Sequence, residues 1–195
     1  MRLVVVGATG TVGAAVADLL EGRGHQVLRA SRNGAVKVDL TDAGSIRAMY
    51  ESVGRVDGVI SCAGMARIGS LTTLGEEDWS KSIADKLMGN VNLVRLGVDR
   101  VADSGVFVLT SGIWSQKPPP GAVIVSTLNG ALESFARSAA RDLPRGIRLV
   151  GISPPWIDES ARKMGQRGVL TAVDNARAYV AAVEGRSTAE VVYPT

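Results

Sequence analysis

Short runs of valine, isoleucine and leucine alternate with amphipathic helical patterns along the whole chain of 195 residues. The apolar runs have the length of strands, and the patterns between them repeat every three or four residues, as helices do. Strands that alternate with helices are typical of a parallel sheet covered by helices on both faces, and right-handed crossovers make such a sheet doubly wound. We therefore predict an α/β fold of this kind. The predicted strands cover residues 2–6, 25–30, 35–38, 57–60, 105–110, 146–152 and 189–193, and the predicted helices 11–22, 43–53, 76–103, 121–146 and 171–184.

The length of the chain predicts one globular domain that spans residues 1–195. The net charge is only +3 and the basic residues are scattered, whereas nucleic-acid binding usually needs a basic stripe. Cys62 is the only cysteine, which excludes an internal disulfide and fits a reducing cytoplasm. No apolar run reaches the roughly 18 residues of a membrane span, and glycine interrupts the N-terminal run too early for a signal peptide. We expect a cytoplasmic protein without nucleic-acid or membrane partners.

A glycine-rich turn, "GATGTVG", connects the first predicted strand to the first predicted helix. Glycine permits the tight turn, lets backbone N–H groups approach a pyrophosphate, and leaves the positive end of the helix open to phosphate. This context predicts a Rossmann-type dinucleotide site, and the alternative is a tight turn without a ligand. The cofactor contacts expected from this segment are Gly7, Thr9, Gly10, Thr11, Val12 and Gly13.

The end of the second predicted strand indicates which dinucleotide binds. NAD sites usually place an acidic residue there to bind the ribose 2′-hydroxyl, but residues 22–38 contain neither aspartate nor glutamate. Ser31 and Arg32 follow this strand instead, and together they can hold a 2′-phosphate. We therefore predict NADP(H) as the cofactor in preference to NAD(H). The alternative is that Arg32 is an ordinary solvated loop residue.

These motifs resemble those of the short-chain dehydrogenase/reductase family, and the resemblance covers nearly the whole chain. "VDLTD", "SCAG" (61–64), "ISPPWIDES" (152–160) and "NGALESFARSAARDLPRGIRL" each match a segment of the family in order. The resemblance implies a small-molecule substrate and a homodimer or homotetramer formed through the helices at 76–103 and 121–146. It also implies further cofactor contacts from Asp39, Ala63, Gly64, Asn129 and Pro154.

The catalytic pattern of the family is not retained. Its Tyr-x-x-x-Lys pair aligns with Val125 and Asn129, its asparagine aligns with Lys86, and its serine aligns with Gly112 or the adjacent Ser111. The family tyrosine donates a proton, and the lysine binds ribose and lowers the pKa of the tyrosine, so Val125 and Asn129 cannot replace them. The chain resembles a subgroup with an intact glycine motif and a degenerate catalytic set.

Lys86 and Ser111 are the remaining catalytic candidates. A desolvated lysine can donate a proton, although Lys86 is equally compatible with a helix surface or a subunit interface. Asp158 and Glu159 are possible bases or solvated loop acids, Trp114 and Trp156 are a possible apolar wall, and Cys62 is a small core residue. Ser126 and Thr127 are expected to satisfy N–H groups at the start of their helix, and Glu133 to pair with Arg137 on its outer side. No metal-ligand spacing is present.

Three functions remain open at this point. The first is an NADP(H)-dependent oxidoreductase on a small carbonyl or alcohol with a non-standard proton donor. The second is a non-redox enzyme on the same scaffold, such as a cyclase, isomerase or dehydratase. The third is a non-catalytic NADP(H)-binding partner or sensor. Lys86 and Ser111 favour an enzyme, whereas Val125 and Asn129 favour the other two.

Overall fold

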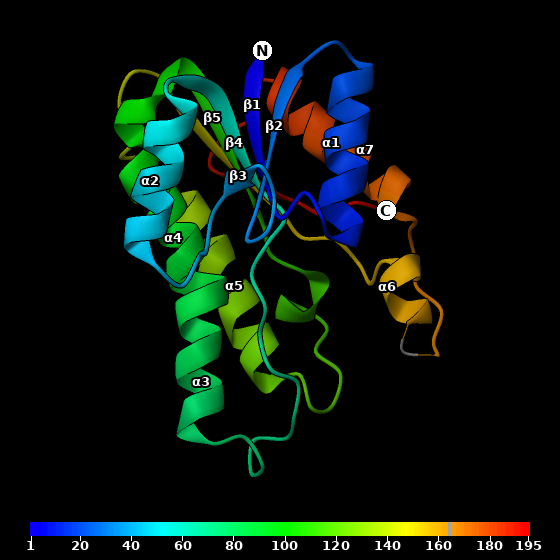
Figure 1. The fold of residues 1–195 in the computed structure, drawn as a ribbon. Helices are drawn as coiled ribbons and strands as arrows, with labels where there is room; N and C mark the ends of the chain where they lie inside the picture. The colour runs from blue at the N-terminus through cyan, green and yellow to red at the C-terminus, as the bar shows by residue number, and fades with distance from the viewer. Residues whose placement is uncertain (164) are drawn as a thin grey trace.

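The computed structural model describes residues 1–163 and 165–195, and a seven-stranded sheet forms its centre (Figure 1). All neighbouring strands are parallel, and their order is β3-β2-β1-β4-β5-β6-β7. This topology confirms the predicted doubly wound α/β fold of Rossmann type. The strands are β1 (Arg2–Val6), β2 (Gln26–Ser31), β3 (Val36–Lys37), β4 (Val56–Ser61), β5 (Val101–Thr110), β6 (Arg148–Ile152) and β7 (Glu190–Val192).

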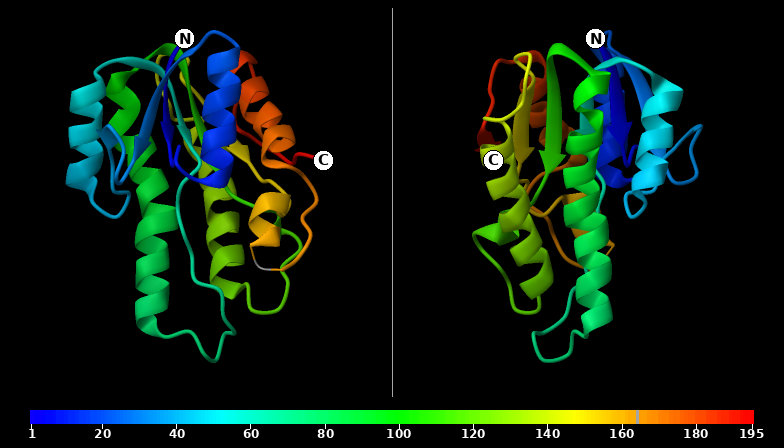
Figure 2. Two further views of the ribbon diagram at one scale, coloured as in Figure 1. Left: turned by 45° about the vertical axis from the view of Figure 1, so that its right-hand side comes forward. Right: turned by 90° about the vertical axis from the view of Figure 1, so that its left-hand side faces the viewer.

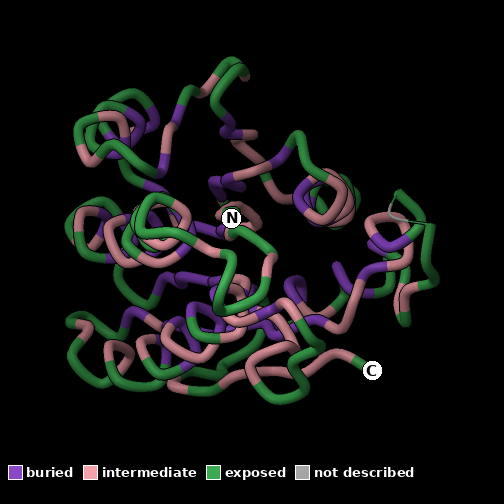
Figure 3. The backbone as a smooth tube through the Cα atoms, turned by 90° about the horizontal axis from the view of Figure 1, so that it is seen from below, coloured by how far each residue is buried: buried purple, intermediate pink, exposed green. Residues whose placement is uncertain are grey.

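Helices cover both faces of the sheet, as Figure 2 shows. On one face, α1 (Thr11–Gly22) and α7 (Ala172–Glu184) lie side by side. On the other face lie α2 (Ala43–Val53), α4 (Gly89–Gly97) and α5 (Val123–Ala139). The strand residues alternate between the two resulting cores: Val4 packs against the α2–α4–α5 layer and Leu3 against the α1–α7 layer. Figure 3 shows the buried residues toward the middle of the molecule, including parts of the surrounding helices.

The predicted helix at 76–103 is a chain of four different segments. It consists of α3 (Glu76–Ser82), the π-helical η1 (Ile83–Met88), α4 and the 3₁₀-helical η2 (Val98–Arg100). Strand β5 then begins at Val101, and the prediction that it begins at residue 105 was wrong. Val101 pairs with Val56 of β4, and this non-local pairing extends the strand across Ser104, whose φ of 59° is unusual for a serine.

Helix α5 is shorter than predicted, because it ends at Ala139 and not near Pro144. Pro144 disfavours helical geometry at Leu143, the residue before it, and residues 140–142 form hydrogen-bonded turns after the helix. Two short helices, η3 (Ile113–Ser115) and α6 (Asp158–Arg162), were not predicted.

The carboxyl ends of the strands form one edge of the molecule, and α3, the first turns of α5 and α6 project beyond this edge (Figure 1). The strand order changes direction between β1 and β4, and ligands of open α/β sheets bind at such a crevice. Within residues 1–163 and 165–195, no helix is long and apolar enough to cross a bilayer.

Candidate functional site

The glycine turn has a backbone that only glycine fits at two positions. Gly7 has a φ of +81°, and a Cβ atom there would lie 2.9 Å from the Cβ of Ala63. A Cβ atom on Gly13 would lie 2.1 Å from the Gly7 carbonyl oxygen, so the first turn of α1 sits directly on the loop. No side chain caps α1 at Gly10. The first N–H groups of this helix are therefore available to an anion.

A cleft of about 380 Å³ opens at this turn, and we refer to it as the glycine-turn cleft. Asp39 lines it with a carboxylate that accepts hydrogen bonds from the Thr41 backbone N–H at 2.9 Å and from the Thr41 hydroxyl at 2.7 Å. These hydrogen bonds lower the pKa of Asp39. Thr11, Val12 and Gly13 belong to the first turn of α1 and do not line the cleft. The predicted cofactor contacts that do line it are Gly7, Thr9, Gly10, Ser31, Arg32, Asp39, Ala63 and Gly64.

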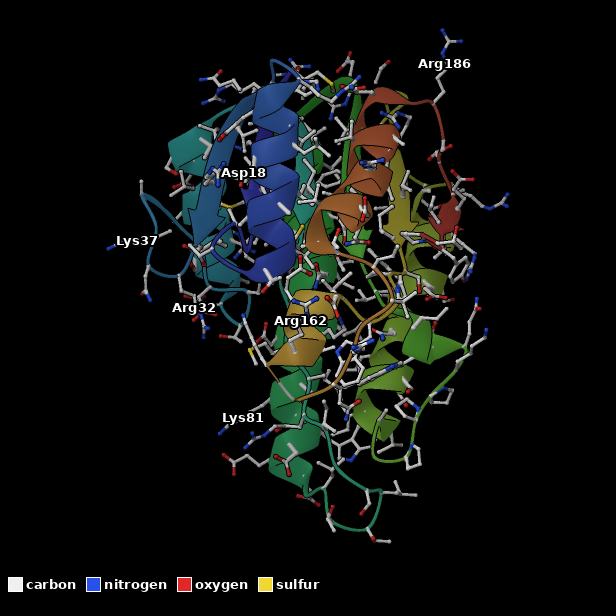
Figure 4. The ribbon with its side chains drawn as sticks, turned by 90° about the vertical axis from the view of Figure 1, so that its right-hand side faces the viewer. Asp18, Arg32, Lys37, Lys81, Arg162 and Arg186 are labelled. Carbon is white, nitrogen blue, oxygen red and sulfur yellow. The ribbon has the colours of Figure 1, made fainter. Side chains whose placement is uncertain are left out.

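The edge of this cleft at the end of β2 is polar and carries a positive charge. Ser31 is buried, and its hydroxyl has no hydrogen-bond partner in the described part of the chain. Arg32 follows it and is exposed, as Figure 4 shows. A buried hydroxyl without a hydrogen-bond partner destabilises the folded protein. A ligand oxygen that accepts a hydrogen bond from Ser31 would remove this cost.

A second cavity of about 340 Å³ adjoins the glycine-turn cleft, and Gly64 and Met65 line both. We refer to it as the tryptophan pocket, because Trp114 and Trp156 meet in its wall with ring centroids 5.7 Å apart in an edge-to-face arrangement. The predicted site residues that the structure brings together here are Lys86, Ser111, Val125, Asn129 and Pro154.

Lys86 is the only ionisable side chain that lines the described wall of the tryptophan pocket. It lies within η1 and is 8% exposed, and the described residues give its amine no hydrogen-bond or ion-pair partner. Burial lowers the pKa of Lys86 to about 8, with a smaller opposing effect from Asp85. An amine of this kind exchanges a proton readily near neutral pH.

Asn129 and Val125 lie one turn apart on α5, and both face the tryptophan pocket. The Asn129 side-chain amide donates to the Gly112 carbonyl at 3.1 Å. Its Oδ1 atom is buried and has no partner among the described residues. Asn129 can therefore accept a hydrogen bond from a ligand hydroxyl, whereas Val125 offers no polar atom.

Ser111 directly follows β5 and lines the same pocket. The Glu133 carboxylate lies against its hydroxyl group on the side away from the pocket. Its hydroxyl lies 3.1 Å from Oε1 of Glu133. The prediction that Glu133 points outward was wrong, since its side chain is only 6% exposed, although Arg137 does lie 3.8 Å away. The signal that was missed is a spacing of four. Val125, Asn129 and Glu133 form one stripe on α5, of which Val125 and Asn129 line the pocket and Glu133 lies behind Ser111.

The chain matches a family model described as enoyl-(acyl carrier protein) reductase over residues 7–193. The chain belongs to the short-chain dehydrogenase/reductase family. Among curated members, it is 27% identical to oxidoreductase UcpA of Salmonella typhimurium over 73% of its own length and 55% of that protein. It is 26% identical to the short-chain reductase NovJ of Streptomyces niveus, with 83% of this chain and 73% of NovJ covered. The chain thus spans about half of the length of UcpA.

Solved structures of similar size match the whole fold. Protein lin1944 of Listeria innocua is 39% identical with a TM-score of 0.96, and each chain is covered fully, at 100%. A small-chain dehydrogenase in complex with NADPH is 26% identical with a TM-score of 0.89, covering 99% of this chain and 95% of its own.

Other predicted candidates in this short-chain dehydrogenase/reductase have structural roles. Burial raises the pKa of the Cys62 thiol to about 12, which disfavours the thiolate. Asp158 pairs with Arg162 at 2.6 Å, and Glu159 accepts hydrogen bonds from the Ala172 N–H at 2.9 and 3.0 Å. Within the described residues, no cluster of histidine, cysteine and carboxylate side chains could hold a metal ion.

The hydroxyl groups at the start of α5 do not cap this helix. Thr127 donates to the Val123 carbonyl at 2.8 Å, and the Ser126 hydroxyl is buried without a partner among the described residues. The prediction that they satisfy N–H groups was therefore wrong. In an α-helix, a hydroxyl bonds more easily to the carbonyl one turn back than to an N–H group of its own turn.

Proposed function

We propose that this protein is an NADP(H)-dependent oxidoreductase that acts on a small carbonyl or alcohol substrate, with its proton-transfer group outside α5. The observation that carries this proposal is the continuity of the two cavities. The glycine-turn cleft leads past Gly64 into the tryptophan pocket, where a buried amine without a partner faces an apolar wall. A dinucleotide laid along this path would place its reactive ring beside that amine.

The residues of the glycine-turn cleft fit NADP(H). The Ser31 hydroxyl and the Arg32 guanidinium would hold the 2′-phosphate, and the open N-terminus of α1 would face the pyrophosphate. Asn129 Oδ1 would accept a hydrogen bond from a ribose hydroxyl. The NADPH complex of the related small-chain dehydrogenase supports the same cofactor. When bound, the nicotinamide supplies hydride chemistry, and the protein supplies position and the proton.

Lys86 is the group that we propose to exchange a proton with the substrate oxygen. In the family this task falls to a tyrosine at the position of Val125, which holds no proton to give. The ammonium of Lys86 donates to the oxygen of a carbonyl substrate, and the neutral amine accepts the proton in the reverse direction. The lowered pKa, near 8, keeps both forms accessible in neutral solution.

Titration with NADPH and with NADH tests the cofactor assignment, with nucleotide fluorescence as the readout. We expect NADPH to bind at least tenfold more tightly, because only NADPH carries the phosphate that pairs with Arg32. Arg32→Ala should reduce this preference, whereas the matched control Arg186→Ala, on a side chain that projects into solvent in Figure 4, should leave it intact. Equal affinities of the wild type for the two nucleotides would contradict the assignment.

A non-catalytic NADP(H)-binding protein is the second candidate, and Val125 and Asn129 favour it. The two candidates differ in what Lys86 does. In an oxidoreductase, Lys86→Met should abolish turnover of a substrate while NADPH binding remains. In a binding protein, no panel of small ketones or alcohols should change the NADPH absorbance at any pH, although the nucleotide binds.

We further propose that the protein assembles as a homodimer or homotetramer through residues 76–103 and α5. The apolar strip on α5 and at its C-terminal end supports this proposal: Phe135, Ala139 and Ala140 are only partly buried by the α2–α4–α5 core. Ile83 and Met88 of η1 are 36% and 41% exposed. Light scattering at micromolar concentration should give at least twice the mass of one chain, and the mass of one chain would refute the proposal.

A further inference from the structure

The direction in which the Ser111 hydroxyl points decides what the tryptophan pocket can bind. This hydroxyl has one hydrogen and lies 3.1 Å from Glu133 Oε1 and 3.2 Å from the Ile152 carbonyl oxygen. Both neighbours only accept when the glutamate is ionised. If the hydrogen turned toward the pocket, the serine oxygen would face two other oxygens with no proton between them. The hydrogen is therefore held behind the pocket wall, and Ser111 offers the pocket only a lone pair.

Glu133 is built into the fold as an acceptor. Besides Ser111, its Oε1 atom accepts hydrogen bonds from the hydroxyls of Ser115 at 2.6 Å and Ser153 at 2.9 Å. Its Oε2 atom accepts from the Tyr193 hydroxyl at 3.0 Å. Three serines and a tyrosine thus donate to one buried carboxylate, and they come from η3, from the ends of β5 and β6, and from the segment after β7. This network prevents Glu133 from offering a hydrogen to Ser111.

The opposite polarity comes from Lys86, which lines the same pocket. An ammonium only donates, so the pocket combines a donor, Lys86, with two acceptors, Ser111 and the unpartnered Oδ1 atom of Asn129 among the described residues. A hydroxyl group has the polarity to use both kinds of partner, because it can donate its hydrogen to Ser111 and accept one from Lys86. A ketone oxygen satisfies Lys86 alone and leaves the lone pair of Ser111 without a hydrogen. The remaining wall includes the two tryptophans, Ile68, Val125 and Ile157, which suits an apolar body.

We propose that the tryptophan pocket selects ligands that carry a hydroxyl group on an apolar or aromatic body, and that Glu133 is the positioning residue that makes Ser111 an acceptor. The binding preference does not depend on the proposed function. Only the statement that the bound alcohol is a substrate, oxidised in the proposed reaction, rests on that function. The selection itself is a property of the side chains.

Three matched fluorinated probes test the assignment: 1-(4-fluorophenyl)ethanol, its methyl ether and 4-fluoroacetophenone. Their affinities for the nucleotide-free protein are measured by ¹⁹F NMR titration. We expect the alcohol to bind about three- to tenfold more tightly than the ketone or the ether, which is the effect of one net hydrogen bond. Equal or tighter binding of the ketone, or no binding of any probe, would overturn the proposal. Because no nucleotide is present, a failure here is separate from a failure to bind NADP(H).

Glu133→Gln tests the positioning role. A glutamine amide can donate to Ser111, and the Ser111 hydrogen can then turn toward the pocket. The ratio of alcohol to ketone affinity should therefore fall while the fold is kept. The matched control Glu184→Gln changes a surface carboxylate that pairs with Arg23, and the ratio should not change. If Glu133→Gln does not fold, Ser111→Ala should still reduce the preference for the alcohol over the ether. A folded Glu133→Gln variant, or Ser111→Ala, that keeps the wild-type preference would contradict the role.

Discussion

The glycine-turn cleft and the tryptophan pocket lie next to each other, yet they depend on different parts of the polypeptide. At the glycine turn the cleft is lined by the backbone of Gly7 and Gly10, and the close packing of Gly13 against the Gly7 carbonyl fixes this turn. The pocket depends on side chains, and we infer from the sequence motifs that Val125 and Asn129 there replace the tyrosine and lysine of the family. A site made of backbone persists as long as the fold does. A site made of side chains can change its chemistry while the cavity around it remains.

The largest effect is expected from restoring the family pair in the pocket. In Val125→Tyr with Asn129→Lys, a phenol and an ammonium face the pocket one turn apart on α5. NADPH-dependent reduction of activated ketones should rise by roughly 10²–10⁴, the usual contribution of general acid catalysis. Stopped-flow measurement of NADPH absorbance checks this gain.

Each single variant should gain less than the pair, because the lysine acts largely by lowering the pKa of the tyrosine. If the double variant folds and binds NADPH but remains inactive, the pocket has lost more than a proton donor. Ready reduction of the same ketones by the wild type would contradict the expected gain, because it would mean that a proton donor outside α5 already acts on them. It would leave Lys86 and Ser111 as the groups to replace next.

The glycine turn should be destabilised by even one added methyl group. In Gly13→Ala, the new methyl group would meet the Gly7 carbonyl oxygen at 2.1 Å, so the turn must move. We expect a loss of about 3 kcal/mol in the free energy of unfolding, together with loss of NADPH binding. The matched control is Gly130→Ala on α5, where a Cβ atom meets nothing within 4 Å. This control should be neutral or more stable by up to about 1 kcal/mol, as judged by urea denaturation.

In the tryptophan pocket, removal of the charged Lys86 side chain should instead stabilise the folded protein. The pKa of Lys86 lies near 8 in the folded protein and at its ordinary 10.5 in the unfolded chain, so burial of the charge destabilises the fold below pH 8. Lys86→Met should raise the free energy of unfolding at pH 7 by about 1–3 kcal/mol. Between pH 8 and 10.5 the wild type loses this penalty, and the difference from the variant should shrink. A difference that is constant with pH would show that Lys86 is not buried as described.

The order of strands and helices was predictable because apolar periodicity reports which residues face a core. The predictions failed where a non-local or irregular contact decides the structure. Val101 joins β5 because Val56 lies beside it, and no local pattern around Val101 shows this pairing. The π-helical turn that holds Lys86 interrupts the helical repeat by one residue, which a period of 3.6 cannot represent.

The positions of the site residues were predicted better than their interactions. Lys86, Ser111 and Asn129 were expected in one pocket from the family resemblance, and they all line it. Glu133 was assigned to the outer side of α5 because its spacing from Arg137 suggested a surface pair. Its burial depends on Ser153 and Tyr193, which come from segments far along the chain. Such a network is visible only after the fold brings its members together.

The titration of Lys86 tests most directly whether the proton-transfer group of the pocket lies on η1, at Lys86, and not on α5. The protein is labelled with ¹³Cε-lysine, and the Cε shift of Lys86 is assigned by comparison with Lys86→Met and followed from pH 6 to 11. We predict that Lys86 titrates near pH 8, well below the ordinary lysine value of 10.5. Titration of Lys86 near 10.5 would contradict the account.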